Sequence, residues 1–246
     1  IHRRCRATNN SFEVEVPSTI MKRLAQMPVK PQPAKFTNTH LEEIVKILGG
    51  SRELNVLDPF AGVGTIHNLP YFTRGLELEP EWADQHHATI VGDALDTGFD
   101  NECFDAVVTS PCFGNRMADS FKAKDDSKRH TYHHYLGRPP SKGSSAIMQW
   151  GKEYKEFHRK AWLEAKRVLV LEGKLIINIK DHIRNGEIQP VTKWHIETCL
   201  DIGLKMEGEV SIPVGGLTHG ENYEKRIPHE SLLVFSKKVA LEDSIS

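Results

Sequence analysis

The stretch LNVLDPFAGVGT, residues 54–65, decides the fold of this chain. Its first four residues form an apolar run of strand length, and Asp58, Gly62 and Gly64 follow closely. Glycines directly after a strand let backbone N–H groups come close to a ligand, and ligands of open α/β sheets lie beyond the carboxyl ends of the strands. The stretch therefore predicts a strand and a tight turn at a binding site, although a purely structural turn would have the same glycine spacing.

Further apolar runs of strand length follow this stretch, at residues 74–78, 88–91, 104–109, 173–179, 204–212 and 230–237. Segments with helical character lie between or beside them, at residues 81–87, 154–169 and 191–200. This alternation predicts a parallel sheet with crossover helices. We expect the last two runs to form an antiparallel hairpin at the sheet edge. The sequence thus predicts an α/β fold with a mostly parallel, seven-stranded sheet.

Residues 1–34 differ in character from the rest of the chain. They end in a proline-rich run at residues 28–33, which is typical of a linker. We therefore expect an N-terminal accessory segment at residues 1–34 and one domain at residues 35–240. The first helix of this domain is expected to begin at Thr39, because Thr39 and Glu42 have the spacing of a capping box.

Charge and cysteine content exclude several classes of protein. The 246 residues carry a formal net charge of -1, which argues against a uniformly basic nucleic-acid binder but permits a local basic surface. The four cysteines lack CxxC pairing and the spacing of zinc ligands, so we expect reduced thiols in a cytoplasmic protein. No apolar run approaches the roughly 18 residues of a membrane span, and residues 1–4 lack the apolar segment of a signal peptide. A membrane partner is therefore not expected.

A second informative stretch is TSPCFGNR, residues 109–116, which closes an apolar run and then presents polar, cyclic and aromatic groups together. Ser110 brings a hydroxyl, Pro111 a backbone carbonyl and Phe113 an aromatic ring. These groups suit one task well, which is to grip the exocyclic amine of a flat heterocycle while a ring stacks on its face. We interpret this stretch as the start of an active site.

The octet at residues 58–65 closely resembles motif I of the S-adenosylmethionine-dependent DNA amino-methyltransferases. The fourth motif of that family reads Ser-Pro-Pro-Tyr or Asp-Pro-Pro-Tyr, and SPCF at residues 110–113 matches it, with Cys112 in place of the second proline. Other family motifs are matched in the right order at residues 33–36, 75–80 and 92–94. The resemblance covers about residues 33–238. It implies a Rossmann-like class I methyltransferase fold and S-adenosyl-L-methionine as the cofactor.

The resemblance also assigns roles to individual residues. Glu77 would accept hydrogen bonds from the ribose hydroxyls, Asp93 would lie against the adenine amino group, and Phe36 would cover the cofactor. Each has a structural alternative: Glu77 as a solvated charge at a strand end, Asp93 as a turn cap, and Phe36 as a core residue ahead of the first helix. The implied cofactor-binding residues are Phe36, Asp58, Pro59, Phe60, Ala61, Gly62, Gly64, Thr65, Glu77, Leu78, Asp93 and Ala94.

Residues 110–113 would form the catalytic motif of a direct methyl transfer. The Ser110 hydroxyl and the Pro111 carbonyl would accept hydrogen bonds from the amine, and Phe113 would stack on the base. Such a transfer requires orientation and electrostatics rather than a metal or a covalent intermediate. Cys112 is included in the motif, but it loosens the backbone and adds an N–H where the family has a second proline.

Cys112 also raises the alternative of cytosine C5 methylation, in which a cysteine attacks the base. In C5 enzymes the attacking cysteine follows two prolines, so it aligns with Phe113 rather than with Cys112. The glutamate expected to assist the base is also missing from residues 176–181. The sequence therefore favours an amine as the target.

The substrate is expected to contact a long, basic segment of low hydrophobicity at residues 114–150. Long loops in a compact domain are usually functional or disordered, and a basic, aromatic loop beside the catalytic motif suits phosphate contact and support of a flipped base. A solvated loop is the alternative. The segment's histidines have no cysteine or carboxylate at ligand spacing, so no metal is expected. The expected substrate-binding residues, two of them in a second loop at 213–229, are Asn115, Arg116, Lys128, Arg129, Tyr132, Asn222 and Arg226.

These patterns favour S-adenosyl-L-methionine-dependent methylation of an exocyclic base amine in DNA by base flipping, with cytosine N4 slightly favoured over adenine N6. RNA is the main alternative substrate. A catalytically silent module that binds the cofactor or nucleic acid is a second alternative, with the change from proline to Cys112 as its sequence trace. The oligomeric state and the biological role, whether restriction-modification, regulation or viral self-protection, stay open.

Overall fold

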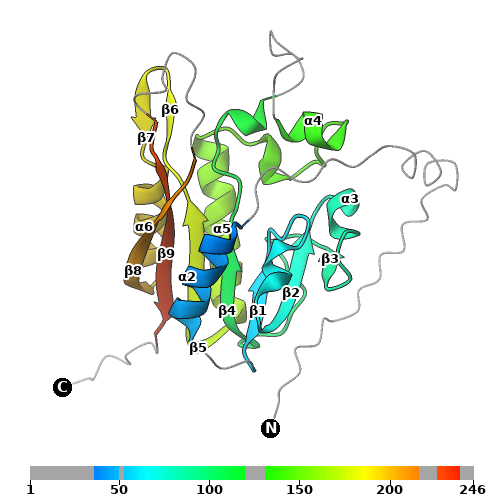
Figure 1. The fold of residues 1–246 in the computed structure, drawn as a ribbon, viewed down its shortest axis with the longest axis vertical. Coiled ribbons are helices and arrows are strands. Elements are labelled where there is room, and N and C mark those ends of the chain that lie inside the picture. Colours follow the sequence, from blue (N-terminus) through cyan, green and yellow to red (C-terminus); the bar gives the residue numbers. More distant parts are fainter. Residues whose placement is uncertain (1–35, 50–52, 120–130, 216–225, 239–246) are drawn as a thin grey trace, which may run out of the picture.

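The computed structural model describes residues 36–49, 53–119, 131–215 and 226–238, so the predicted accessory segment lies outside the described residues (Figure 1). These ranges contain a seven-stranded sheet in the order β3-β2-β1-β4-β5-β9-β8. Strands β1 to β5 are parallel, and β9 pairs antiparallel with both β5 and β8. The predicted mostly parallel sheet with an antiparallel edge hairpin is confirmed. The strands are β1 (Asn55–Asp58), β2 (Phe72–Glu77), β3 (Thr89–Val91), β4 (Phe104–Thr109), β5 (Leu169–Ile179), β8 (Leu204–Pro213) and β9 (His229–Lys237).

Neighbouring residues of the central strands belong to two different hydrophobic clusters. In β4, Val107 lies in the first cluster, whereas Ala106 and Val108 lie in the second. Strand β5 divides in the same way, with Leu175 in the first cluster and Ile176 in the second. Successive side chains of a strand point to opposite faces, so both faces of the central sheet are buried, as is usual for parallel strands.

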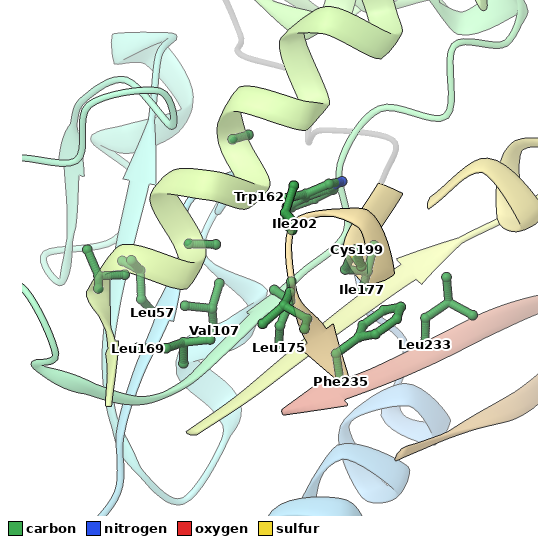
Figure 2. Close-up of a cluster of buried hydrophobic side chains, with 14 of the residues drawn as sticks. Leu57, Val107, Trp162, Leu169, Leu175, Ile177, Cys199, Ile202, Leu233 and Phe235 are labelled. Carbon is green, nitrogen blue, oxygen red and sulfur yellow. The ribbon is translucent and has the colours of Figure 1, made fainter. Parts of the chain in front are cut away.

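Helices cover the two faces of the sheet. Helices α5 (Lys152–Val168) and α6 (Val191–Asp201) cover the face of the first cluster, where Trp162 and Cys199 lie near Leu175 (Figure 2). Helix α2 (Asn38–Leu48) packs on the opposite face through the buried Ile44. None of the helices in the described ranges combines the length and hydropathy that a membrane-spanning helix needs.

Helix α2 is capped by Thr37, and the predicted cap at Thr39 with Glu42 is wrong. The Thr37 side chain accepts a hydrogen bond from the His40 N–H, and the His40 ring accepts one from the Thr37 N–H. This is the reciprocal arrangement of a capping box. The prediction failed because a histidine occupies the position where glutamate or glutamine is usual.

The connections on both sides of β2 contain little helix. Between β1 and β2 the chain forms only the 3₁₀-helix η1 (Thr65–Asn68), and the helix predicted at residues 81–87 is limited to α3 (Pro80–Ala83). Pro70 explains the first case, because proline has no N–H and disfavours helical geometry at the residue before it. The part of the sheet around β2 therefore has less helical cover than the part that packs against α5 and α6.

Strands β6 (His182–Arg184) and β7 (Glu187–Gln189) and helix α4 (Tyr132–Leu136) were not predicted from the sequence. Strands β6 and β7 form a hairpin that projects beyond the main sheet at the top of Figure 1. Its turn residues Asn185 and Gly186 have φ angles of 53° and 79°, which is the signature of a type I′ turn. The inserted segment contains helix α4. The Asn-Gly pair was a usable sequence signal for the hairpin.

Cysteine chemistry differs from the expectation at one position. Cys112 and Cys199 are free thiols, whereas Cys103 is disulfide-bonded. The expectation of reduced cysteines throughout is therefore wrong at Cys103. Sequence spacing does not reveal which cysteines the fold brings together.

Candidate active site

A cavity opens near the carboxyl ends of β1, β2 and β4. The empty space between its walls, including the open solvent at its mouth, measures about 520 Å³. The strand order reverses between β1 and β4, and this is where ligands bind in open α/β sheets. The cavity is lined by Pro59, Phe60, Glu77, Leu78, Trp82, Gly92, Asp93, Ala94, Ser110, Cys112, Tyr132, Gly143, Ser144, Ser145, Ala146 and Phe157.

Asp58 joins the first motif to the catalytic strand. It ends β1 and is 2% exposed, and its Oδ1 accepts hydrogen bonds from the Phe60 N–H at 3.0 Å and the Thr109 hydroxyl at 2.7 Å. Burial raises the pKa of Asp58 to about 7, although both hydrogen bonds act in the opposite direction. Asp58 is not among the lining residues. It fixes the turn after β1 to the end of β4, next to Ser110.

Glu77 ends β2 and lines the cavity. Its Oε2 accepts a hydrogen bond from the Gly62 N–H, and its Oε1 accepts one from the Glu79 N–H, both at 2.9 Å. Burial raises the pKa of Glu77 to about 7. A carboxylate has about four acceptor positions, so Glu77 can hold the glycine turn and still accept a hydrogen bond from a ligand hydroxyl. The alternative of a solvated charge is wrong, because Glu77 is only 8% exposed.

The glycine turn is needed for its backbone shape. Gly62 and Gly64 have φ angles of 53° and 82°, a region that favours glycine. A Cβ atom on Gly64 would also lie 2.8 Å from the Cβ of His86. Neither glycine lines the cavity, and the same holds for Ala61 and Thr65. These predicted cofactor residues therefore shape the wall from behind it.

Phe36 lies in the hydrophobic cluster beneath α2, together with Ile44. It is 6% exposed, and its N–H donates a hydrogen bond to the Thr65 hydroxyl at 3.3 Å. This placement supports the structural interpretation of Phe36 as a core residue. Its role as a cover for the cofactor stays a prediction.

The loop after β3 supplies Gly92, Asp93 and Ala94 to the cavity wall. The Asp93 Oδ1 accepts a hydrogen bond from the Leu95 N–H at 2.8 Å. Asp93 is therefore a turn cap that also lies at the cavity, so the two interpretations of this residue are compatible.

The inserted segment forms the far wall of the cavity. Tyr132 and Ala146 pack with Trp82 in a small cluster, and Cys112 packs against them. Trp82 is 2% exposed, and its indole Nε1 has no hydrogen-bond partner among the described residues. Buried donors are usually paired, so an open donor in a residue of the cavity wall suits an acceptor on a ligand. Sequence reasoning missed Trp82, although it lies just beyond the predicted acidic motif at residues 75–80.

A set of charged and polar contacts, the Arg138 cluster (Arg138, Ser141, Glu79 and Glu81), attaches this wall to the β2–α3 connection. The Arg138 guanidinium donates to Glu79 at 2.7 Å and to both oxygens of Glu81 at 2.8 and 2.5 Å. Ser141 donates to Glu79 from its N–H at 2.7 Å and from its hydroxyl at 2.9 Å. Glu79 is 0% exposed. The basic Arg138 thus holds the inserted segment in place through two carboxylates.

Ser110 lines the cavity, and its hydroxyl belongs to a hydrogen-bond network with residues of three elements. It accepts a hydrogen bond from the Asn178 amide at 3.2 Å, and the same amide donates to Glu230 at 2.8 Å. His40 Nε2 lies 3.1 Å from the same Glu230 oxygen. Sequence reasoning missed Asn178, Glu230 and His40, because they come from β5, β9 and α2 and share no local pattern.

Cys112 is poorly suited to act as a nucleophile. Burial raises the pKa of its thiol to about 11, against the effect of hydrogen bonds with Ser145 and Tyr132. The attacking form of cysteine is the thiolate, and at neutral pH this thiol is protonated. The environment of Cys112 therefore disfavours the C5 alternative.

The aromatic rings at the cavity differ from those expected. Phe113 packs against the first hydrophobic cluster and is not among the lining residues, so its stacking role stays a prediction. Phe60 and Phe157 line the cavity instead, with ring centroids 6.1 Å apart. Pro111 is buried beside Ser110.

The predicted substrate residues fall into several groups. Tyr132 lies in the cavity wall. The Asn115 side chain accepts a hydrogen bond from the Met117 N–H at 2.9 Å, next to a short 3₁₀-helix that begins at Arg116. Arg226 is exposed ahead of β9. No group of metal-ligating side chains occurs within the part of the chain that the structure describes. Three predicted residues lie outside the described ranges, namely Lys128, Arg129 and Asn222.

No protein-family model and no curated protein matches the chain. Solved structures match it at the level of the fold. The YcgJ protein from Bacillus subtilis has a TM-score of 0.51 at 14% identity, over 83% of this chain and 100% of that chain. Geranyl diphosphate methyltransferase in complex with GPP and sinefungin has a TM-score of 0.50 at 13% identity, over 81% and 78% of the two chains. TrmN from Thermus thermophilus has a TM-score of 0.50 at 12% identity, over 83% and 50%. The chain therefore has the Rossmann-like fold of the class I methyltransferases.

Proposed function

We propose that the protein is an S-adenosyl-L-methionine-dependent methyltransferase that modifies an exocyclic base amine in DNA, with cytosine N4 slightly favoured over adenine N6. The observation that carries the proposal is that Ser110 of the SPCF motif and Glu77 of the acidic motif line the same cavity. The Ser110 hydroxyl suits contact with an amine, and the Glu77 carboxylate suits contact with the hydroxyls of a ribose. The class I methyltransferase fold supports the same reaction class.

The residues around the cavity fit S-adenosyl-L-methionine. Glu77 offers carboxylate oxygens to the ribose hydroxyls, and Asp93 offers a carboxylate to the adenine amino group. The open indole N–H of Trp82 offers a donor, and Phe60 and Leu78 offer apolar surface. When bound, this cofactor supplies an electrophilic methyl group on a sulfonium centre.

On the substrate side, the difficulty is that the amine lone pair is delocalised into the ring of the base. The Ser110 hydroxyl and the Pro111 carbonyl accept hydrogen bonds from the two amine protons, which favours a more tetrahedral and more nucleophilic nitrogen. Asn178 holds the Ser110 oxygen in place. The protein then contributes mainly orientation, and its protonated Cys112 thiol takes no part in bond formation.

The base has to leave the duplex to reach this cavity. The wall formed by the inserted segment supports a base that has been flipped out, and Tyr132 lies in that wall. Contact with the nucleic-acid backbone and base edges is assigned to Asn115, Arg116, Lys128, Arg129, Asn222 and Arg226.

Calorimetry with S-adenosyl-L-methionine, followed by transfer of a radiolabelled methyl group to unmethylated DNA and RNA, tests the proposal. We expect saturable cofactor binding and transfer to DNA. Methyl transfer to RNA but not to DNA would show that the substrate is RNA instead of the proposed DNA. Cofactor binding without transfer to either would contradict the enzymatic proposal and favour a silent binding module.

A further inference from the structure

The backbone of residues 110–113 is held by a chain of buried hydrogen bonds that begins in α5 and α6. The Tyr154 hydroxyl donates to the Cys112 carbonyl at 2.9 Å and lies 3.0 Å from His195 Nε2. The Trp162 indole N–H donates to His195 Nδ1 at 3.0 Å. Tyr154, Trp162 and His195 are each 0% exposed.

The direction of these hydrogen bonds follows from the chemistry of the three side chains. An indole N–H is only a donor, so His195 Nδ1 accepts and carries no proton. The neutral imidazole then carries its proton on Nε2 and donates to the Tyr154 oxygen. The Tyr154 hydroxyl therefore donates its own proton to the Cys112 carbonyl oxygen. Burial lowers the pKa of His195 well below its usual value, and His158 lowers it further, so the ring stays neutral.

The Cys112 position is where the chain lacks the second proline of the motif that it resembles. A proline ring fixes φ, whereas the φ angle of a cysteine is free to vary. The hydrogen bond from Tyr154 to the Cys112 carbonyl restrains the same short segment in a different way. Tyr154 fixes the Cys112 carbonyl, and the neighbouring Pro111 carbonyl is the acceptor that the proposed reaction uses.

We propose that Tyr154, oriented by His195 and Trp162, is a positioning residue that takes over the role of the missing proline and holds the Ser110 and Pro111 acceptors in register with the target amine. This inference rests on the proposed function and deepens it. Tyr154 acts through the backbone and does not touch the cofactor or the base.

The first test is Tyr154→Phe, which removes one oxygen atom and both of its hydrogen bonds. We expect kcat to fall by about 10- to 100-fold, the size expected for a small misplacement of reacting groups. The KM for DNA and the affinity for S-adenosyl-L-methionine should stay near those of the wild type, because Tyr154 does not line the cavity. A fall in cofactor affinity as large as the fall in kcat would overturn the positioning role.

A rescue experiment separates positioning from general stability. Cys112→Pro should restore most of the kcat in the Tyr154→Phe background, because proline fixes φ without the hydrogen bond. The left-handed region is occupied, among the described non-glycine residues, by Glu102, Glu172 and Asn185, so Cys112 has a negative φ, which is the sign that proline requires.

The matched control is Cys112→Ala in the same Tyr154→Phe background. It removes the thiol but does not restrict φ, so we expect no recovery of kcat. Recovery with both substitutions, or with neither, would overturn the inference.

Two measurements test the inference without any substrate. They apply even if the wild type methylates neither DNA nor RNA, because that result would contradict the proposed function and leave the positioning of residues 110–113 by Tyr154 to be tested separately. Hydrogen exchange over residues 109–116 should speed up in Tyr154→Phe and slow again after Cys112→Pro, and unchanged exchange would overturn the inference. Nitrogen-15 NMR of the wild type should show His195 protonated on Nε2. Protonation on Nδ1 would overturn the inference without relying on any variant that has to fold.

Discussion

At the scale of single residues, Asp58 and Glu77 are buried carboxylates that hydrogen bond to neutral groups. Backbone N–H groups and the Thr109 hydroxyl satisfy them, but burial still raises the pKa of each to about 7. A shift of this kind makes stability depend on pH. Asp58 allows the clearest test, because the same oxygen accepts both of its hydrogen bonds.

Asp58→Asn retains an acceptor oxygen and does not titrate. The pKa of Asp58 is about 7 in the folded protein against an ordinary value of 3.8, so the folded state holds the proton more tightly. The contribution of Asp58 to stability is complete below about pH 4 and is lost as the pH rises through about 7. The free energy of unfolding of the wild type should fall, relative to Asp58→Asn, by about 1.4 kcal/mol per pH unit in this window. Urea unfolding at pH 5 and pH 7 measures this, and a difference that does not change with pH would refute the assigned environment of Asp58.

Ser110→Ala removes the hydroxyl acceptor of the proposed reaction. We expect kcat to fall by about 10²- to 10³-fold, as for loss of one hydrogen bond made at the reacting centre. Cofactor affinity should stay nearly unchanged, because Asp58 and Glu77 are untouched. Steady-state kinetics and calorimetry check the two parts, and equal losses in both would mean that Ser110 belongs to the cofactor side.

At the scale of elements, the Arg138 cluster determines whether the inserted segment forms the far wall of the cavity. Arg138→Met leaves the Glu79 carboxylate buried with only Ser141 as a partner within the cluster. We expect a loss of about 1–3 kcal/mol in the free energy of unfolding, below the full cost for a buried pair because Arg138 is one-third exposed. Cofactor affinity should fall as well, because residues 143–146 of that wall follow the cluster in sequence.

The matched control is Arg159→Met. Arg159 pairs with Asp201 on the surface, with side-chain exposures of 50% and 68%, so its loss should cost only about 0–1 kcal/mol and leave cofactor affinity unchanged. Urea unfolding and calorimetry on both variants make the comparison. Equal effects would show that the Arg138 cluster does not support the wall.

The elements also show what sequence can and cannot predict. Strand β4 was predicted with its observed bounds, because residues 104–109 are apolar and end at a proline motif. The α2 cap was misplaced because His40 is an unusual capping partner. The inserted segment and Tyr132 were predicted at the site. The Ser110 network and the contribution of Trp82 to the far wall were not, because Asn178, Glu230 and Trp82 reach the site only through the fold.

At the scale of the whole molecule, the topology brings the separate motifs together. Strand β1 lies between β2 and β4, so Asp58, Glu77 and Ser110 end neighbouring parallel strands or follow them directly. Glu77 and Ser110 therefore line one cavity, although their motifs are separate in the sequence. The net charge of -1 means that attraction to DNA depends on local cations rather than on the charge of the whole protein.

This dependence on local cations can be measured. DNA affinity should fall as salt increases, and Lys128→Ala combined with Arg129→Ala should reduce the slope of log K against log salt by about one for each phosphate that is no longer neutralised. Filter binding over a salt series gives the slope. An unchanged slope would remove both residues from the substrate surface.

Mass spectrometry of the nucleosides from DNA treated with the enzyme and S-adenosyl-L-methionine tests the central claim most directly, because it identifies the modified atom. We predict N4-methylcytosine, or N6-methyladenine as the second choice within the same mechanism, and neither product from Ser110→Ala. C5-methylcytosine, or the absence of any methylated nucleoside in DNA despite cofactor binding, would contradict the account.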